Sequence, residues 1–299
     1  MSSITGVYTA IATPFLPNSE IDWEGFEKLV GLQKEAKIDG LVVCGTTGES
    51  PALSVQEKLS LIRKAKVLAN GQMKIMGGTG GNNTQQSVEL SRLAVDAGAD
   101  SLLIVTPPYN KPSLAGMIGH FSAIAKEVRV PLCLYHVPGR TGQHLTVEEL
   151  REVCALPSVT SVKEASGNLA FYSRGIEATK ASFLSGDDIT FLPSLSVGGS
   201  GVVSVISNLF PKAWKRLYTS YQQKDLKDAL AIHNATLELN QHLYCESNPG
   251  PLKAALSVAG ICKNEVRLPL APVRSENFEK VRATYQATVK NLKALGINE

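Results

Sequence analysis

The chain has 299 residues, of which 43% are hydrophobic and 19% are charged, and its formal net charge is +3. This composition is typical of a globular protein with a sizeable core and excludes a disordered chain. The small charge and the lack of a long apolar run favour neither a nucleic-acid-binding nor a membrane-spanning protein. The start of the chain does not resemble a secretory signal, and the five cysteines are widely spaced. We therefore expect reduced thiols in a cytoplasmic protein, with neither disulfides nor a metal site.

Eight short apolar segments, each followed by a stretch of helical period, predict parallel strands that are covered on both faces. They are Val7–Ala12, Gly40–Cys44, Lys74–Gly78, Ser101–Val105, Pro131–Tyr135, Val159–Lys163, Ala181–Ser185 and Gly201–Ser204. A strand about every 28 residues, each followed by a helix, predicts a (β/α)8 TIM barrel. A doubly wound open sheet is the alternative, although it usually has fewer strands.

Several helices have recognisable starts. The segments Ser54–Glu57 and Thr146–Glu149 are capping boxes, in which a hydroxyl and a glutamate satisfy the first backbone amides. Asp22 is expected to cap another helix, whose inward apolar stripe begins at Trp23.

The strand–helix repeat ends near Gln223, and the remaining sequence is helical. Apolar stripes predict three helices at Asp225–Leu243, Pro251–Ala259 and Glu276–Leu295. We therefore expect a catalytic barrel over residues 1–223 and a helical extension over residues 224–299.

In a barrel, the active site lies where the strands end, so the loops that follow them are informative. The Gly45–Ser50 loop places two threonines between glycines and suits a small carboxylate, with an ordinary capped turn as the alternative. The Gly77–Asn82 loop lacks the third glycine of a dinucleotide-binding motif, so a close-packed turn is expected.

The next two strands end in aromatic and basic residues. Tyr109 follows two prolines on a loop, where a tyrosine is more often a packing residue. Tyr135 ends its strand, and the turn after it presents Arg140, which suits a carboxylate ligand or a solvated surface. His136 is expected to be a structural histidine.

The sixth strand ends in Lys163, followed by Glu164. Lysine is rarely buried without a purpose, and at a barrel mouth its amine can act as a Schiff-base nucleophile. A lysine that pairs with Glu164 or extends to water is an equal alternative. In the loop after the seventh strand, Asp187 and Asp188 are expected to cap the next helix.

Three motifs in this order, Gly45–Glu49, Tyr135–Thr141 and Val162–Glu164, resemble the dihydrodipicolinate synthase and N-acetylneuraminate lyase superfamily. The resemblance covers nearly the whole chain. The segments Tyr135–Thr141 and Glu246–Pro251 are most similar to its dihydrodipicolinate synthase family. That resemblance implies condensation of pyruvate with L-aspartate 4-semialdehyde on the route to diaminopimelate and lysine, with no metal or organic cofactor.

The resemblance also implies the catalytic roles. Lys163 would form an imine with the ketone of pyruvate, and Thr46, Tyr135 and Tyr109 would form a proton relay. In the family, the tyrosine that matches Tyr109 reaches into the neighbouring subunit's site. A homo-oligomer, typically a dimer of dimers, is therefore implied.

Four further residues are implied to bind substrate. Thr47 and neighbouring amides would hold the pyruvate carboxylate, and Arg140 would hold the carboxylate of the semialdehyde. The backbone near Gly186 and Val203 would line the pocket.

One departure concerns the cleft in which some family members bind the inhibitor lysine. Asn82 is kept, but Gln86, Lys58 and Pro108 replace a glutamate, a histidine and a tyrosine. An ammonium ligand would lose a carboxylate partner and gain a positive neighbour, so weak or absent inhibition by lysine is expected.

Three other functions remain open from the sequence. The nearest is a related pyruvate-dependent aldolase that acts on sialic acid or a sugar-derived oxo acid, which would share Lys163 and Tyr135. A non-catalytic oxo-acid-binding protein is opposed by the intact set of candidate catalytic residues. A nucleotide-dependent oxidoreductase rests only on the failed glycine match.

Overall fold

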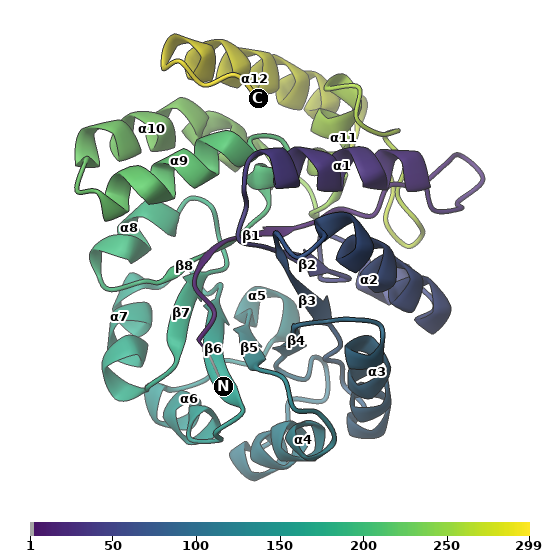
Figure 1. The fold of residues 1–299 in the computed structure, drawn as a ribbon, viewed down its shortest axis with the longest axis vertical. Coiled ribbons are helices and arrows are strands. Elements are labelled where there is room, and N and C mark those ends of the chain that lie inside the picture. The colour runs from purple at the N-terminus through teal and green to yellow at the C-terminus, as the bar shows by residue number, and fades with distance from the viewer. Residues whose placement is uncertain (1–2) are drawn as a thin grey trace.

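The computed structural model describes residues 3–299, in which eight parallel strands form a closed barrel (Figure 1). Each strand pairs with its neighbours in chain order, and the last strand closes on the first. The strands are β1 (Gly6–Ala10), β2 (Gly40–Val43), β3 (Lys74–Gly78), β4 (Ser101–Val105), β5 (Leu132–His136), β6 (Val159–Glu164), β7 (Ser182–Ser185) and β8 (Gly201–Ser204).

A ring of helices covers the outside of the barrel (Figure 1). It comprises α1 (Trp23–Glu35), α2 (Val55–Ala69), α3 (Thr84–Asp96), α4 (Leu114–Glu127), α6 (Val147–Cys154), α7 (Leu169–Ala178), α8 (Phe191–Ser196) and α9 (Pro211–Gln222). Helix α9 follows the last strand and completes the strand–helix repeat.

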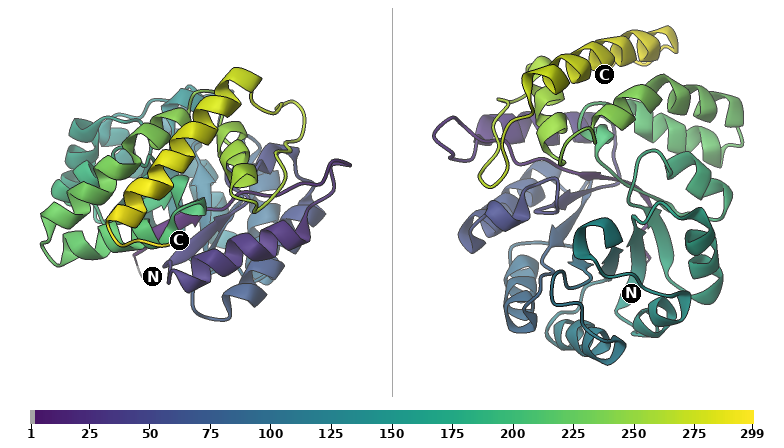
Figure 2. Two further views of the ribbon diagram at one scale, coloured as in Figure 1. Left: turned by 90° about the horizontal axis from the view of Figure 1, so that it is seen from above. Right: turned by 180° about the vertical axis from the view of Figure 1, so that it is seen from behind.

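Three further helices, α10 (Leu226–His242), α11 (Gly250–Val258) and α12 (Ser275–Ala294), lie on one side of the barrel (Figures 1 and 2). Helix α10 packs against α9 and α12, and α11 packs against α12. Within residues 3–299, no helix is both long and apolar enough to cross a membrane.

The protein has two separate apolar cores, as expected of strands that are covered on both faces. The larger core lies between the strands and the surrounding helices. The smaller fills the barrel interior and includes Tyr8, Met76, Leu103, Tyr135, Leu184 and Val203. The closed end of this interior gives the mouth a rigid floor.

The predicted barrel is confirmed, and all eight expected strands occur with bounds that shift by two residues or fewer. Both capping boxes form, and Asp22 accepts a hydrogen bond from the amide of Gly25 at 2.9 Å. The prediction for Trp23 is wrong, because its side chain is 39% exposed. Trp23 is the first residue of α1, and the buried apolar face of this helix begins at Phe26.

Candidate active site

The barrel mouth brings Lys163 and Tyr135 side by side. Each is the penultimate residue of its strand, and the two are register partners on β6 and β5, so their side chains point the same way. Lys163 is only 5% exposed, and its Nζ lies 4.0 Å from the centroid of the Tyr135 ring. An amine and a phenol in this position can both reach a small ketone held in the mouth.

Glu164 does not pair with Lys163, because its carboxylate is engaged elsewhere. Glu164 Oε1 accepts a hydrogen bond from the amide of Ser166 at 2.8 Å and lies 3.1 Å from His136 Nδ1. The other ring nitrogen of His136 accepts from the amide of Leu145 at 3.2 Å. We therefore assign the ring proton to Nδ1, from which it is donated to Glu164. His136 has the structural role predicted for it.

The Gly45–Ser50 loop folds back on itself at the end of β2. The amide of Glu49 donates to the carbonyl of Thr46 at 3.0 Å, and Glu49 has a left-handed φ of 53°. Thr47 is 3% exposed, whereas Thr46 is half-buried. The loop is therefore compact, and the role of its two hydroxyls in binding a carboxylate stays a prediction.

A buried ion pair joins this loop to the helical extension. Lys253 of α11 is fully buried, and its Nζ lies 2.5 Å from Glu49 Oε1. The same nitrogen donates to the carbonyl of Glu265 at 2.7 Å and sits 4.1 Å from the centroid of the Phe15 ring. Glu49 Oε2 accepts from the amide of Arg267 at 2.9 Å. The sequence analysis missed this pair, although a lysine inside an apolar helix was a usable signal.

Asn248, in the turn before α11, also contacts the mouth. Its side-chain nitrogen donates to Thr47 Oγ1 at 3.0 Å, and its backbone carbonyl accepts from Arg140 Nη2 at 3.3 Å. Arg140 is exposed on the short α5 (Pro138–Thr141). The sequence analysis singled out the Glu246–Pro251 segment for its resemblance to the family, but it predicted neither contact.

The structure does not bring Tyr109 to the other candidates within one chain. Its side chain is 90% exposed, and its φ of 71° is left-handed. Lys163 and Tyr135 therefore lie together at the mouth, while Tyr109 is exposed on the loop after β4.

The two remaining candidates are Gly186, directly after β7, and Val203, within β8. The amide of Gly186 donates to the carbonyl of Glu164 at 2.7 Å, and a Cβ on Gly186 would come within 2.6 Å of that of Ala165. Glycine is needed here for this close approach. Val203 is fully buried in the interior cluster that also contains Tyr135.

Asp187 and Asp188 do not cap the following helix, so that prediction is wrong. Asp188 Oδ2 accepts from the amides of Val205 and Ile206 at 2.8 and 2.9 Å, at the start of the 3-10 turn η2 (Ile206–Asn208). Asp187 accepts from the amide of Ile189, two residues on. An aspartate can satisfy any amides within reach, and tertiary folding placed those of η2 nearer to Asp188.

Replacement of Asp188 by asparagine should change how stability depends on pH. Burial raises the pKa of Asp188 from 3.8 to about 6. The folded protein then binds more protons than the unfolded chain between these values, so this group destabilises the fold as pH rises. Relative to the wild type, the free energy of unfolding of Asp188→Asn should increase by about 2–3 kcal/mol between about pH 4 and about pH 7.5. Urea titrations at both pH values measure this, and a difference that is independent of pH would contradict it.

The remaining sequence motifs carry no further chemistry. The Gly77–Asn82 loop is a close-packed turn, since a Cβ on Gly78 would lie 2.3 Å from the carbonyl oxygen of Cys44. Over residues 3–299, no group of three or more histidine, cysteine or acidic side chains could hold a metal ion. Burial raises the pKa of the Cys133 thiol, inside the barrel, to about 11.

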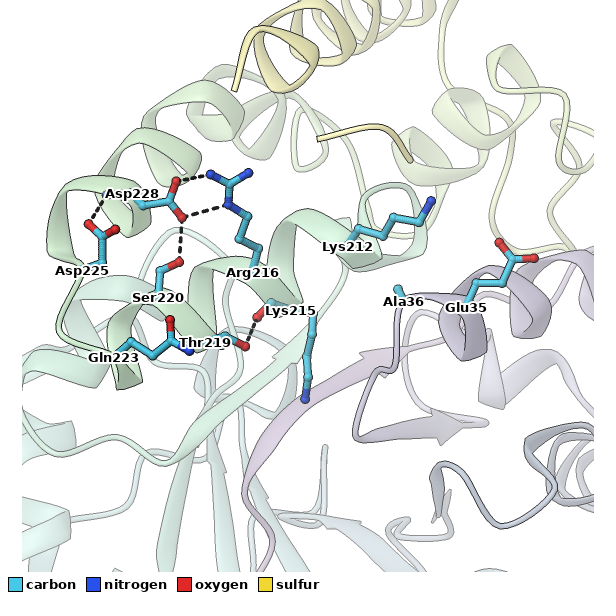
Figure 3. A pocket seen from close by; sticks show the side chains of 10 residues that line it. All are labelled: Glu35, Ala36, Lys212, Lys215, Arg216, Thr219, Ser220, Gln223, Asp225 and Asp228. Atoms are coloured by element: carbon cyan, nitrogen blue, oxygen red, sulfur yellow. Dashed lines mark hydrogen bonds and ion pairs between the residues drawn. The ribbon is translucent and has the colours of Figure 1, made fainter. Parts of the chain in front are cut away.

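A cavity of about 550 Å³ lies outside the barrel, lined by the end of α1 and by residues of α9 and α10 (Figure 3). Three of its charged side chains, those of Lys215, Arg216 and Asp228, are paired. Arg216 binds Asp228 with two hydrogen bonds, and Lys215 donates to Asp39 at 2.7 Å. Because its lining includes neither Lys163 nor Tyr135, the cavity is separate from the candidate active site.

Comparisons with known proteins agree on one family. The model of the "Dihydrodipicolinate synthetase family" matches residues 3–288. The chain is 45% identical over 280 residues to a 4-hydroxy-tetrahydrodipicolinate synthase of Nitratidesulfovibrio vulgaris, covering 93% of the chain and 96% of the relative. A relative with the same name from Magnetococcus marinus is 41% identical over 95% of the chain and 97% of its own length.

Solved structures give the same result. The 4-hydroxy-tetrahydrodipicolinate synthase of Methylacidiphilum fumariolicum SolV superposes with a TM-score of 0.95 at 40% identity, over 98% of this chain and 99% of that one. A dihydrodipicolinate synthase of Acinetobacter baumannii complexed with pyruvate has a TM-score of 0.93 at 37% identity, over 96% of this chain and 99% of that one.

Proposed function

The chain belongs to the dihydrodipicolinate synthetase family, and from this premise we propose how the barrel mouth performs the family's reaction. The enzyme condenses pyruvate with L-aspartate 4-semialdehyde to 4-hydroxy-tetrahydrodipicolinate, in the diaminopimelate route to lysine. The observation that supports the residue assignment best is the buried Lys163 amine beside the Tyr135 ring, without Glu164 as its partner.

Lys163 is the nucleophile of this proposal. Its neutral amine attacks the ketone carbon of pyruvate, and loss of water leaves an imine on Nζ. The imine withdraws electrons from the adjacent methyl group, so that a proton can leave and an enamine forms. The enamine carbon then attacks the aldehyde carbon of the second substrate, and the aldehyde oxygen takes up a proton as the new carbon–carbon bond forms. The amino group of that substrate then attacks the imine carbon, which closes the ring and releases the Lys163 amine. The lysine performs the electron withdrawal itself, so we propose that neither a metal nor an organic cofactor takes part.

Tyr135 is the proton donor and acceptor nearest to the imine. A phenol ordinarily keeps its proton at neutral pH, so a chain of hydroxyls is needed to move protons on and off it. We assign this relay to Thr46 and Tyr135 of one chain with Tyr109 of a neighbouring chain.

The two substrate carboxylates are held at different places. Thr47 and the amides of its loop bind the carboxylate of pyruvate, and the planar guanidinium of Arg140 binds that of the semialdehyde. Gly186 and Val203 line the pocket between them. Fixing both substrates in one orientation converts a bimolecular condensation into a nearly unimolecular step.

Borohydride reduction tests the imine directly. Incubation with pyruvate and borohydride should add one reduced pyruvate to a peptide that contains Lys163, as measured by mass spectrometry. A related aldolase would show the same adduct, so the second substrate decides between them. Turnover with aspartate semialdehyde but not with N-acetylmannosamine supports this proposal, and the reverse preference overturns it.

We propose a homo-oligomer, with a dimer of dimers as the expected form. Support comes from Tyr109, which is 90% exposed with a left-handed φ of 71° and does not reach the mouth of its own chain. An aromatic side chain this exposed is better explained by burial against a second copy. We also propose a cytoplasmic location, which the five free cysteines support.

Subunit mixing should show that Tyr109 acts across the interface. Tyr109→Phe should lower kcat about 10- to 100-fold, because one relay hydroxyl is lost. Mixed with inactive Lys163→Ala chains, it should recover about a quarter of wild-type activity per site, since half of random dimers carry one complete site. The two variants are unfolded, mixed and refolded together, and each variant unfolded and refolded alone is the control. Mixtures no more active than the sum of the two parents would contradict an action in trans.

Lysine should inhibit this enzyme weakly or not at all. Lys58 is half-buried, and the positive charge of its side chain repels the ammonium group of a ligand. Gln86 offers no charge to pair with that ammonium, and Pro108 offers no hydroxyl. Initial rates at rising lysine concentration measure the effect, and half-inhibition at sub-millimolar lysine would refute the prediction.

A further inference from the structure

We propose that Asn248 is a positioning residue that orients both carboxylate-binding side chains, Thr47 through its amide and Arg140 through its backbone carbonyl. This inference rests on the proposed function, and it makes the helical extension part of the catalytic apparatus. Asn248 lies in the turn between α10 and α11, about two hundred residues along the chain from the loop that it contacts.

The contact with Thr47 determines what that hydroxyl can do. Asn248 Nδ2 donates to Thr47 Oγ1 at 3.0 Å, and both side chains are buried, at 6% and 3% exposure. Because the hydroxyl oxygen is occupied as an acceptor, its own proton is directed away from Asn248 and is available as a donor. A carboxylate has only acceptors, so this arrangement prepares Thr47 to bind the carboxylate of pyruvate.

The contact with Arg140 acts on the second carboxylate. Arg140 is exposed on a four-residue helical turn, where a long side chain has many rotamers. The carbonyl of Asn248 accepts from Arg140 Nη2 at 3.3 Å and restricts the guanidinium to the mouth. The remaining N–H groups of the guanidinium stay free to donate to a ligand.

The turn that carries Asn248 is itself held firmly. Five residues further on, Lys253 is fully buried and paired with Glu49, which belongs to the same loop as Thr47. Asn248 and Lys253 thus contact the Gly45–Ser50 loop at two residues, Thr47 and Glu49. Side chains that are fixed before the substrate arrives bind it with a smaller entropic cost.

The test uses the isosteric variant Asn248→Asp together with Asn248→Ala. Aspartate cannot donate a hydrogen bond to Thr47 Oγ1 and instead accepts one from the Thr47 hydroxyl. Thr47 then no longer donates to pyruvate. The readout is the pyruvate concentration that gives half-maximal borohydride trapping on Lys163, which does not depend on the second substrate. We expect it to rise about tenfold in Asn248→Ala and further in Asn248→Asp, because one hydrogen bond is lost and a like charge is added.

A double-mutant cycle separates positioning from a general loss of structure. Thr47→Val should raise the same concentration, and Asn248→Ala combined with Thr47→Val should be no worse than Thr47→Val alone. Asn240→Ala is the matched control, since Asn240 is equally buried in the extension but its amide has no hydrogen-bond partner within residues 3–299. It should leave the trapping concentration unchanged.

The possible outcomes are distinct. Additive losses in the cycle, or equal effects of the Asn240 and Asn248 variants, would overturn the positioning role. Thermal unfolding of each variant checks that the fold is retained, and Asn248→Asp preserves the shape of the side chain if Asn248→Ala unfolds. Failure of the wild type to trap pyruvate on Lys163 would instead refute the proposed function.

Discussion

Replacement of Lys163 by alanine is expected to abolish condensation, with a fall in kcat of at least about 10³-fold. Lys163 supplies the only amine that the register of β5 and β6 places beside Tyr135, at 4.0 Å from its ring. Without that amine, no imine forms, and the methyl group of pyruvate keeps its ordinary acidity. Binding of pyruvate itself should persist, because Thr47 and its loop are unchanged.

The measurement combines steady-state rates with borohydride trapping and mass spectrometry. Lys163→Arg is a useful second variant, since arginine keeps the positive charge and much of the length but forms no imine under these conditions. It should be as inactive as Lys163→Ala. Lys180→Ala, which removes an exposed lysine distant from the mouth, is the control and should retain wild-type rates. A trapped pyruvate in either Lys163 variant would place the nucleophile elsewhere.

The barrel could be predicted from the sequence because its signals are local and repeated. Each strand is a short apolar run. The predicted first and last residues of β3, β4 and β8 are the same as those in the structure. The predicted bounds differ from the observed ones where apolar residues continue past the last paired residues of a strand. Ile11 was predicted within the first strand, but it lies beyond β1, although its amide still donates to the carbonyl of Val42.

The candidate site was predictable only where it depends on strand ends. Lys163 and Tyr135 occupy such positions, and a closed barrel necessarily brings the ends of its strands together. The contacts of Asn248 and Lys253 with the Gly45–Ser50 loop depend on how the helical extension packs on the barrel, and a local sequence pattern does not predict that packing. The sequence also did not decide whether Lys163 pairs with Glu164. The answer depends on a contact between two strands, in which His136 engages the Glu164 carboxylate.

The Glu49–Lys253 pair should be the most sensitive structural element outside the catalytic residues. Both side chains are almost completely buried, at 1% and 0% exposure, with 2.5 Å between Nζ and Oε1. Burial lowers the pKa of Lys253, and the Glu49 carboxylate opposes this shift. Removal of one partner leaves the other as an uncompensated buried charge, which costs about 3–5 kcal/mol.

We therefore expect Lys253→Met to lower the free energy of unfolding by about 3–5 kcal/mol, and Glu49→Gln to lower it comparably. The double variant Glu49→Gln with Lys253→Met should recover much of that loss, because no charge remains unpaired. Lys28→Met is the matched control. It breaks an exposed pair with Glu24 on the surface of α1 and should change stability little.

Urea unfolding at fixed protein concentration measures these differences, since association with other copies would add to the apparent stability. The pair also anchors the loop that carries Thr47, so single variants that still fold should need more pyruvate for half-maximal trapping on Lys163. If the double variant recovers stability but not pyruvate binding, the ion pair has a second role. It then orients the loop that carries Thr47, in addition to stabilising the fold. Equal destabilisation by Lys253→Met and Lys28→Met would contradict the argument, because it predicts a large cost only where a charge is left buried without its partner.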